Sequence, residues 1–116
     1  MKNKEIVIPI LNNEYKVIVV LGNEKFLKRA AKRWYYPDFP IPLGDRRGSC
    51  YNRFDRHPII HLPKMPKTPA EIGTLAHEAT HAINHIFDKL DEVNRDTEVF
   101  AHSIGAIVRG VLKGGE

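Results

Sequence analysis

The chain has 116 residues, of which 42% are hydrophobic and 28% are charged. This composition excludes a disordered or fibrous protein and gives room for one domain with a modest core, so we expect a single domain over residues 1–116. One cysteine cannot form an internal disulfide and fits a reducing compartment; because Pro9, Glu14 and Lys16 interrupt the apolar N-terminal residues, we expect no signal peptide, no membrane span and a cytoplasmic location.

The net charge of +4 conceals an asymmetry between the two halves of the chain. Residues 1–67 carry 14 Lys or Arg against 6 Asp or Glu, whereas residues 68–116 carry 4 against 8. One interpretation is steering toward nucleic acid or another acidic partner. The other is attraction between the two halves together with solubility.

The first elements along the chain are two β-branched runs, residues 5–11 and 15–21. They predict a hairpin, because Asn12 and Asn13 between them tolerate turn conformations. Pro9 places the first strand at an edge or a bulge of the sheet. The second run is apolar on nearly both faces, so we expect both of its sides to be covered.

A helix is predicted over residues 23–34, with apolar residues on one side and basic residues on the other. The basic side either touches phosphate or is simply a solvated face. Residues 36–48 follow with three prolines and no periodicity, which predicts a loop that borders a cleft or wraps over the sheet.

Two short strands are predicted at residues 49–54 and 57–62. Pro58 favours an edge position for the second, and an exposed edge can accept an extended peptide as an added strand. His57 and His61 are about 13 Å apart in a strand, too far to share one metal ion, so we interpret them as surface or rim residues.

The next segment contains the candidate metal-binding and catalytic residues. Thr68, Pro69 and Glu71 form a Thr-Pro-x-Glu start in which Thr68 is the N-cap and Glu71 completes a capping box, and apolar residues continue at helical spacing to about Lys89. Inside this predicted helix stands His77-Glu78-Ala79-Thr80-His81.

Residues four apart in a helix lie on one face about 6 Å apart, so His77 and His81 can bind one metal ion. Imidazole suits zinc, and a catalytic zinc site takes three protein ligands and leaves one position for water. Glu78 lies about 100° round the helix, where it can take a proton from the water instead of binding the metal.

A third ligand is available from a final amphipathic helix that begins after Asp96, its candidate N-cap, and ends at Gly114 and Gly115. A short turn at residues 90–94 would make it an antiparallel helical hairpin with the motif helix.

Three residues compete for the role of third ligand. Glu98 and His102 are one turn apart on the final helix and are both sterically possible. His85 is the weakest candidate, because it lies about 12 Å along the motif helix from His77.

The motif His77-Glu78-x-x-His81 followed by a helix-borne glutamate resembles the gluzincin metallopeptidases, especially minigluzincins and small zincin-like phage proteins. The run from Glu98 to Gly105 is similar to the glutamate helix of those phage proteins, in which an aromatic residue often replaces His102. The resemblance covers about residues 57–112. The metzincin pattern fails, because its glycine and third histidine are replaced by Asn84 and Phe87.

The resemblance implies Glu98 as the third ligand, and a substrate paired with the strand before the motif helix, Ile59–Leu62. We therefore predict an α+β, zincin-like domain: a small twisted, mostly antiparallel sheet, an N-terminal helix, a motif helix and a C-terminal glutamate helix.

The predicted activity is peptide-bond hydrolysis with one Zn²⁺ per chain, held by His77, His81 and Glu98. Glu78 is the expected general base, and His102 either stabilises the oxyanion or orients Glu98. The alternative is a zinc-stabilised, catalytically weak regulatory or interaction protein of phage or plasmid type.

Overall fold

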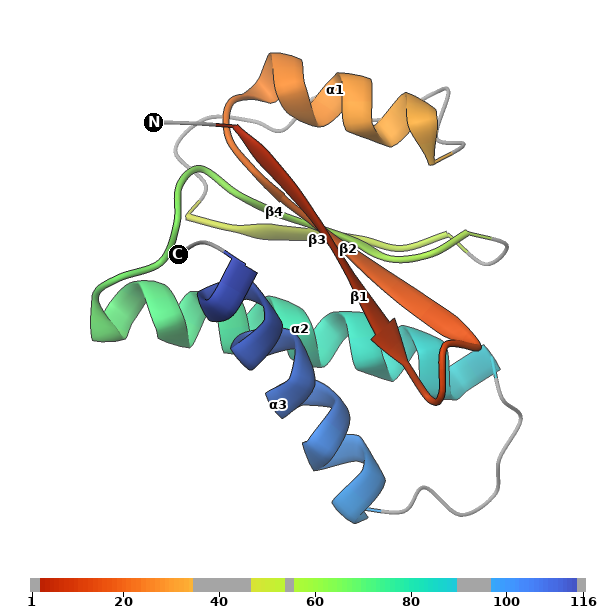
Figure 1. Ribbon diagram of the computed structural model, residues 1–116. Helices are drawn as coiled ribbons and strands as arrows, with labels where there is room; N and C mark the ends of the chain where they lie inside the picture. Colours follow the sequence, from red (N-terminus) through yellow and green to blue (C-terminus); the bar gives the residue numbers. More distant parts are fainter. Residues whose placement is uncertain (1–2, 35–46, 54–55, 90–96, 115–116) are drawn as a thin grey trace.

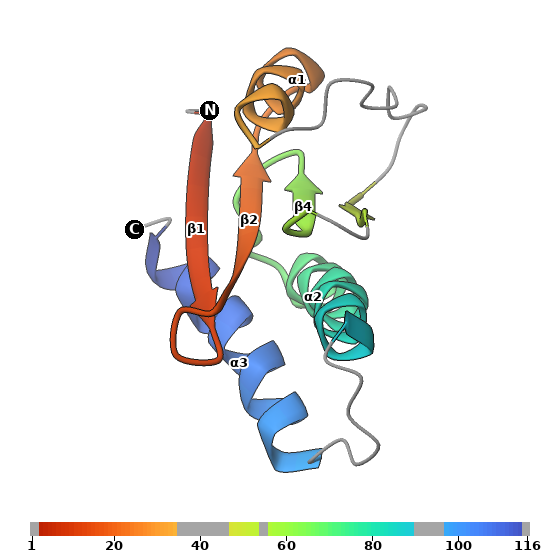
Figure 2. The ribbon, with the colours of Figure 1, turned by 90° about the vertical axis from the view of Figure 1, so that its right-hand side faces the viewer.

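A computed structural model describes residues 3–34, 47–53, 56–89 and 97–114. Its elements are β1 (Lys4–Ile10), β2 (Tyr15–Leu21), α1 (Glu24–Arg33), β3 (Ser49–Tyr51), β4 (Ile59–Leu62), α2 (Pro69–Lys89) and α3 (Thr97–Gly114). Figure 1 shows α1 on one face of the sheet and α2 and α3 on the other, and Figure 2 gives the same arrangement from the side. Most of the predicted loop at 36–48, the turn at 90–94 and the predicted cap Asp96 lie outside the described residues.

The sheet is mixed, with strand order β1-β2-β4-β3. The pairs β1/β2 and β3/β4 are antiparallel, as expected, whereas β2 and β4 are parallel. Between the two parallel strands the chain forms α1 on one face and then the edge strand β3, which runs opposite to β2; the next reversal brings β4 back parallel to β2.

Ile59–Leu62 is therefore not an edge strand, and this prediction is wrong. β4 lies between β2 and β3, and its four residues are buried. Pro58 does not prevent this, because it precedes the strand and its carbonyl oxygen accepts a hydrogen bond from the Ile18 N–H at 3.0 Å. Within the described sheet the edges are β1 and β3, and Pro9 correctly marks β1 as an edge strand.

The turn between β1 and β2 uses the left-handed conformation that the sequence favours. Leu11, Asn12 and Asn13 have φ values of 54°, 55° and 70°. Asparagine tolerates this region better than other non-glycine residues, so the pair Asn12-Asn13 sets the hairpin. The register places Ile10 opposite Tyr15 at the turn and Lys4 opposite Leu21 at the far end.

The two faces of the sheet are covered by separate apolar clusters, as the apolar character of β2 predicts. The larger cluster lies between the sheet and the helices α2 and α3; it includes Val17, Val19, Ile60, Leu75, Ala79, Ile83, Ile86, Ile107 and Val111. The smaller cluster lies under α1 and comprises Ile18, Val20, Leu27, Ala30, Ala31 and Ile59. Alternation along β2 sends successive side chains, from Val17 to Leu21, to opposite clusters.

Helix α1 begins as the sequence predicts, because Asn23 is its N-cap and accepts a hydrogen bond from the Phe26 N–H at 2.9 Å. Helix α3 runs back along the end of α2, where the rings of Phe87 and Phe100 meet edge to face at 5.4 Å. It then continues to β1, where Gly110 lies against Ile8. In the described residues, none of the helices combines the length and the hydropathy needed to cross a membrane.

The start of α2 is fixed by the predicted capping box. The Glu71 N–H donates to Thr68 Oγ1 at 3.1 Å, and Glu71 Oε1 accepts from the backbone N–H groups of Thr68 and Lys67 at 3.0 Å each. These two backbone hydrogen bonds and the ammonium of Lys64 lower the pKa of Glu71 to about 2. Glu71 is therefore ionised at neutral pH and accepts both hydrogen bonds as a carboxylate.

Replacement of the cap tests how much it contributes to stability. We expect Thr68→Ala to lower the free energy of unfolding by about 1 kcal/mol, because the Glu71 N–H loses its acceptor. Urea unfolding followed by circular dichroism measures the change. Thr74→Ala is the matched control, because the Thr74 hydroxyl donates to the carbonyl of Ala70 inside the helix and caps nothing. An equal loss in both variants would contradict the capping role.

Candidate metal site on helix α2

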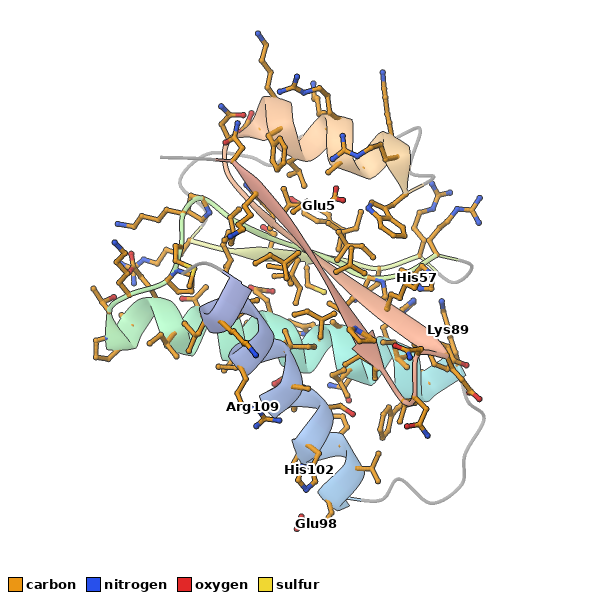
Figure 3. The ribbon with its side chains drawn as sticks, viewed as in Figure 1. Glu5, His57, Lys89, Glu98, His102 and Arg109 are labelled. Atoms are coloured by element: carbon orange, nitrogen blue, oxygen red, sulfur yellow. The ribbon has the colours of Figure 1, made fainter. Side chains whose placement is uncertain are left out.

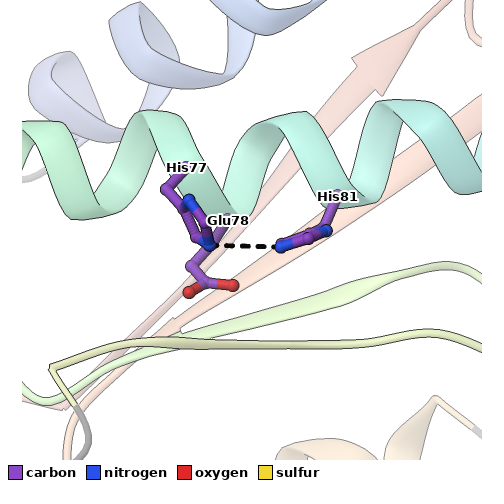
Figure 4. A group of neighbouring side chains, drawn as sticks. All are labelled: His77, Glu78 and His81. Carbon is purple, nitrogen blue, oxygen red and sulfur yellow. Dashed lines mark hydrogen bonds between the residues drawn. The ribbon is translucent and has the colours of Figure 1, made fainter.

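The site is built on the flank of α2, beside the stripe that packs on the sheet. Leu75, Ala79 and Ile83 are fully buried against the sheet, whereas His77 and His81 are exposed. Because the two histidines are four residues apart, the helix brings their rings onto one face. Figure 4 shows both side chains projecting from α2 on the same side as Glu78.

The two imidazoles are spaced as two ligands of one ion would be. Their Nε2 atoms are 3.2 Å apart, and the rings lie edge to face with centroids 4.7 Å apart. Two nitrogen ligands at about 2.0 Å from a tetrahedral zinc are about 3.3 Å apart. The Nε2 pair therefore already has the separation of one edge of such a tetrahedron.

Glu78 completes a group of three ligand-type side chains. One ligand atom from each of His77, Glu78 and His81 lies within 4.8 Å of the other two. Glu78 differs from the histidines because it is only 8% exposed. The group thus consists of two solvent-facing nitrogen donors and one buried carboxylate, and it could hold a metal ion.

Strand β3 reaches this carboxylate because Gly48, just before it, has no side chain. A Cβ atom at Gly48 would lie 2.8 Å from Thr74 Cγ2, 2.9 Å from Leu62 Cδ2 and 3.5 Å from Glu78 Cγ. The first two distances are shorter than real Cβ contacts allow. Gly48 therefore permits the close approach of β3 to α2 beside Glu78, which no pattern in the sequence had indicated.

Cys50 is the neighbour of Glu78 on β3. Burial, and then the negative charge of Glu78, raise the pKa of the Cys50 thiol to about 12. The thiol lies 3.6 Å from Asn52 Oδ1. Since the thiolate is the reactive form, Cys50 is an inert side chain at neutral pH and packs as a small hydrophobic residue.

The structure does not bring Glu98 and His102 to the two histidines of α2. They lie together on the first turns of α3, with Glu98 Oε2 and His102 Nε2 4.0 Å apart and side chains 86% and 78% exposed. Figure 3 shows both at the N-terminal end of α3. The opposite side of α3, with Ser103 and Ile107, is the buried one.

His85 is engaged elsewhere, which agrees with its low rank as a ligand. Its Nε2 donates to the carbonyl oxygen of Arg53 at 2.8 Å, and one turn later Lys89 Nζ donates to the carbonyl oxygen of Arg56 at 2.9 Å. Burial, more than the nearby charge of Lys89, lowers the pKa of His85. These two residues of α2 hold the backbone that connects β3 to β4.

The other two histidines of the β3–β4 region have separate environments. His61 is 7% exposed and its Nε2 donates to the carbonyl oxygen of Gly22 at 2.7 Å, so its interpretation as a surface or rim residue is wrong. His57 is half-buried with its ring against Trp34, and burial lowers its pKa. Neither belongs to the group around Glu78.

Comparison of the chain with protein-family profiles, with curated proteins and with solved structures gives no match. The case for a function therefore depends on the residues and the geometry of this site.

The close approach at Gly48 can be tested by adding a single methyl group. We expect Gly48→Ala to destabilise the fold by about 1–3 kcal/mol, because the new Cβ overlaps Thr74 and Leu62. Gly73→Ala is the matched control: a Cβ at this helical position meets nothing within 4 Å, so alanine should stabilise α2 by about 0.5–1 kcal/mol. Chemical unfolding of both variants measures the difference, and two changes of the same sign would contradict the packing at Gly48.

Proposed function

We propose that this chain is a zinc-dependent peptidase of zincin type, in which His77 and His81 bind the metal and Glu78 is the general base. The observation that carries the proposal is the 3.2 Å separation of the two Nε2 atoms beside a buried carboxylate. Nitrogen donors at this spacing favour zinc over magnesium or calcium, which prefer oxygen ligands.

Each residue has a distinct part in the proposed reaction. Zinc, when bound, supplies Lewis acidity that polarises the scissile carbonyl and lowers the pKa of water toward neutrality. Glu78 accepts the proton of the attacking water and passes it to the leaving amine. Its burial next to β3 keeps its carboxylate close to the two histidines and limits its choice of conformations.

An extended peptide substrate fits best along β3. Within the described sheet, β3 is the edge strand that contacts α2, and it pairs with a described strand, β4, on one side only. Gly48 at the start of β3 packs on Glu78, so a peptide added there runs past the proposed base. This replaces Ile59–Leu62, which lies inside the sheet, as the proposed docking strand.

The third ligand is part of the proposal. Glu98 remains our choice, because the resemblance to gluzincins places a glutamate at this position. In the described structure its carboxylate faces His102, which favours a role for His102 in orienting Glu98 over one in stabilising an oxyanion. Binding by Glu98 requires the first turns of α3 to approach the histidine pair.

The metal and the base can be separated by mutation. We expect one zinc per chain in the wild type and in Glu78→Gln, with hydrolysis of a casein-type substrate reduced in the variant by about 10²- to 10⁴-fold, because the amide cannot accept a proton. His77→Asn should lose the zinc, whereas His57→Asn should keep it as the control. Elemental analysis and a fluorogenic peptidase assay are the measurements.

Two outcomes would contradict this proposal. Unchanged hydrolysis in Glu78→Gln would exclude the residue as the base. A wild-type protein that binds zinc, melts at a lower temperature after chelation and hydrolyses nothing would favour the zinc-stabilised interaction protein over the peptidase.

The third ligand is identified by zinc affinity, measured by competition with a chromophoric chelator. We expect Glu98→Ala to weaken binding more than His102→Ala, whose loss as an outer partner should cost about 10- to 100-fold. A site that is emptied by His102→Ala and left intact by Glu98→Ala would instead be a three-histidine site. If both variants bind as the wild type does, the ligand does not come from the first turns of α3.

A further inference from the structure

The outer side of α1 presents four cations that the proposed peptidase site does not use. We define this basic face as Lys25, Lys28, Arg29 and Lys32, all of them exposed. Within the residues that the structure describes, none of the four lies in an ion pair, whereas the neighbouring Arg33 pairs with Glu5 at 2.7 Å. Within the described part of the chain, no ion pair therefore neutralises the charge of the face.

The rest of α1 is already committed to the core. Its apolar side is buried in the cluster under the sheet through Leu27, Ala30 and Ala31, and Phe26 and Trp34 pack against the same cluster. The helix consequently has no apolar stripe to insert into a lipid surface. It also offers no aromatic ring on the basic face for stacking against unpaired bases.

The spacing of the cations suits a row of phosphates. Lys25 and Lys32 are seven residues apart, so the face extends about 10.5 Å along the helix axis. Successive phosphates of one strand of duplex DNA advance about 3.4 Å along the duplex, so the face spans about three intervals, or four phosphates. The four side chains are cations, which pair with any phosphate oxygen; only contacts of such cations with guanine would add a sequence preference, and the comparison of two duplex sequences tests for it.

We propose that the basic face of α1 binds the phosphate backbone of double-stranded DNA without reading its sequence. The face lies on the opposite side of the sheet from α2 (Figure 1), so this binding is independent of the proposed metal site. A duplex bound at α1 would then leave His77 and His81 on α2 accessible.

The test is fluorescence anisotropy with labelled 20-base-pair duplexes of two unrelated sequences, over a series of salt concentrations. We expect equal affinity for both sequences and a slope of log K against log salt of about −3.6, which is the value for four phosphate contacts. Chelation of metal should leave the binding unchanged.

Two variants with the same net charge separate a local face from overall charge. The quadruple variant Lys25→Gln, Lys28→Gln, Arg29→Gln, Lys32→Gln should bind the duplex at least about tenfold more weakly in low salt and with a slope near zero. The control replaces four exposed cations elsewhere by glutamine: Lys16, Lys67, Arg109 and Lys113. It should keep most of the affinity. Circular dichroism checks that the variants fold. If the quadruple variant does not fold, the single variant Lys28→Glu replaces it, and this change should also weaken binding.

Several results would overturn the proposal. Equal loss in the two quadruple variants would mean that net charge, not α1, attracts DNA. Unchanged affinity in the α1 variant would remove α1 from the interaction. Binding to phosphatidylserine vesicles with no binding to duplex DNA would identify a membrane surface as the partner.

Discussion

The burial of the apolar stripe of α2 against the sheet determines where every other part of the site can lie. Leu75, Ala79, Ile83 and Ile86 are fully buried in one cluster with β2 and β4. Once this stripe faces the sheet, the period of 3.6 residues per turn leaves no choice for the other positions. The paired histidines must face solvent, and the glutamate between them must lie at the boundary with β3. The site is thus a consequence of core packing.

Local rules predicted the elements well, and they failed where distant strands pair. The N-cap Asn23 sets the start of α1, and the capping box at Thr68 sets the start of α2. Both depend on hydrogen bonds between residues close in sequence. The position of β4 was missed, since its partners β2 and β3 are chosen by the whole fold. Pro58 lacks a backbone N–H, but its carbonyl oxygen still accepts a hydrogen bond from the Ile18 N–H of β2.

The same distinction applies to the site. His77, Glu78 and His81 could be predicted as a group because one turn of helix holds them together whatever surrounds it. Glu98 comes from another helix, and its position depends on the connection between α2 and α3 and on how the two helices cross. Periodicity shows that α3 has a buried side and places Glu98 and His102 one turn apart, but it does not show how far these two residues lie from the histidines of α2. The contribution of Gly48 is equally non-local.

The contact between α3 and β1 has a consequence for synthesis on the ribosome. β1 precedes the other described strands in the chain, and its inward-facing isoleucines are covered by α3, which follows every other described element: Ile8 packs on Gly110 and Ile6 on Gly114, while Lys4 Nζ donates to the carbonyl oxygen of Gly114. Until α3 has left the exit tunnel, the nascent hairpin keeps this apolar surface uncovered. The core can therefore close only after α3 is released.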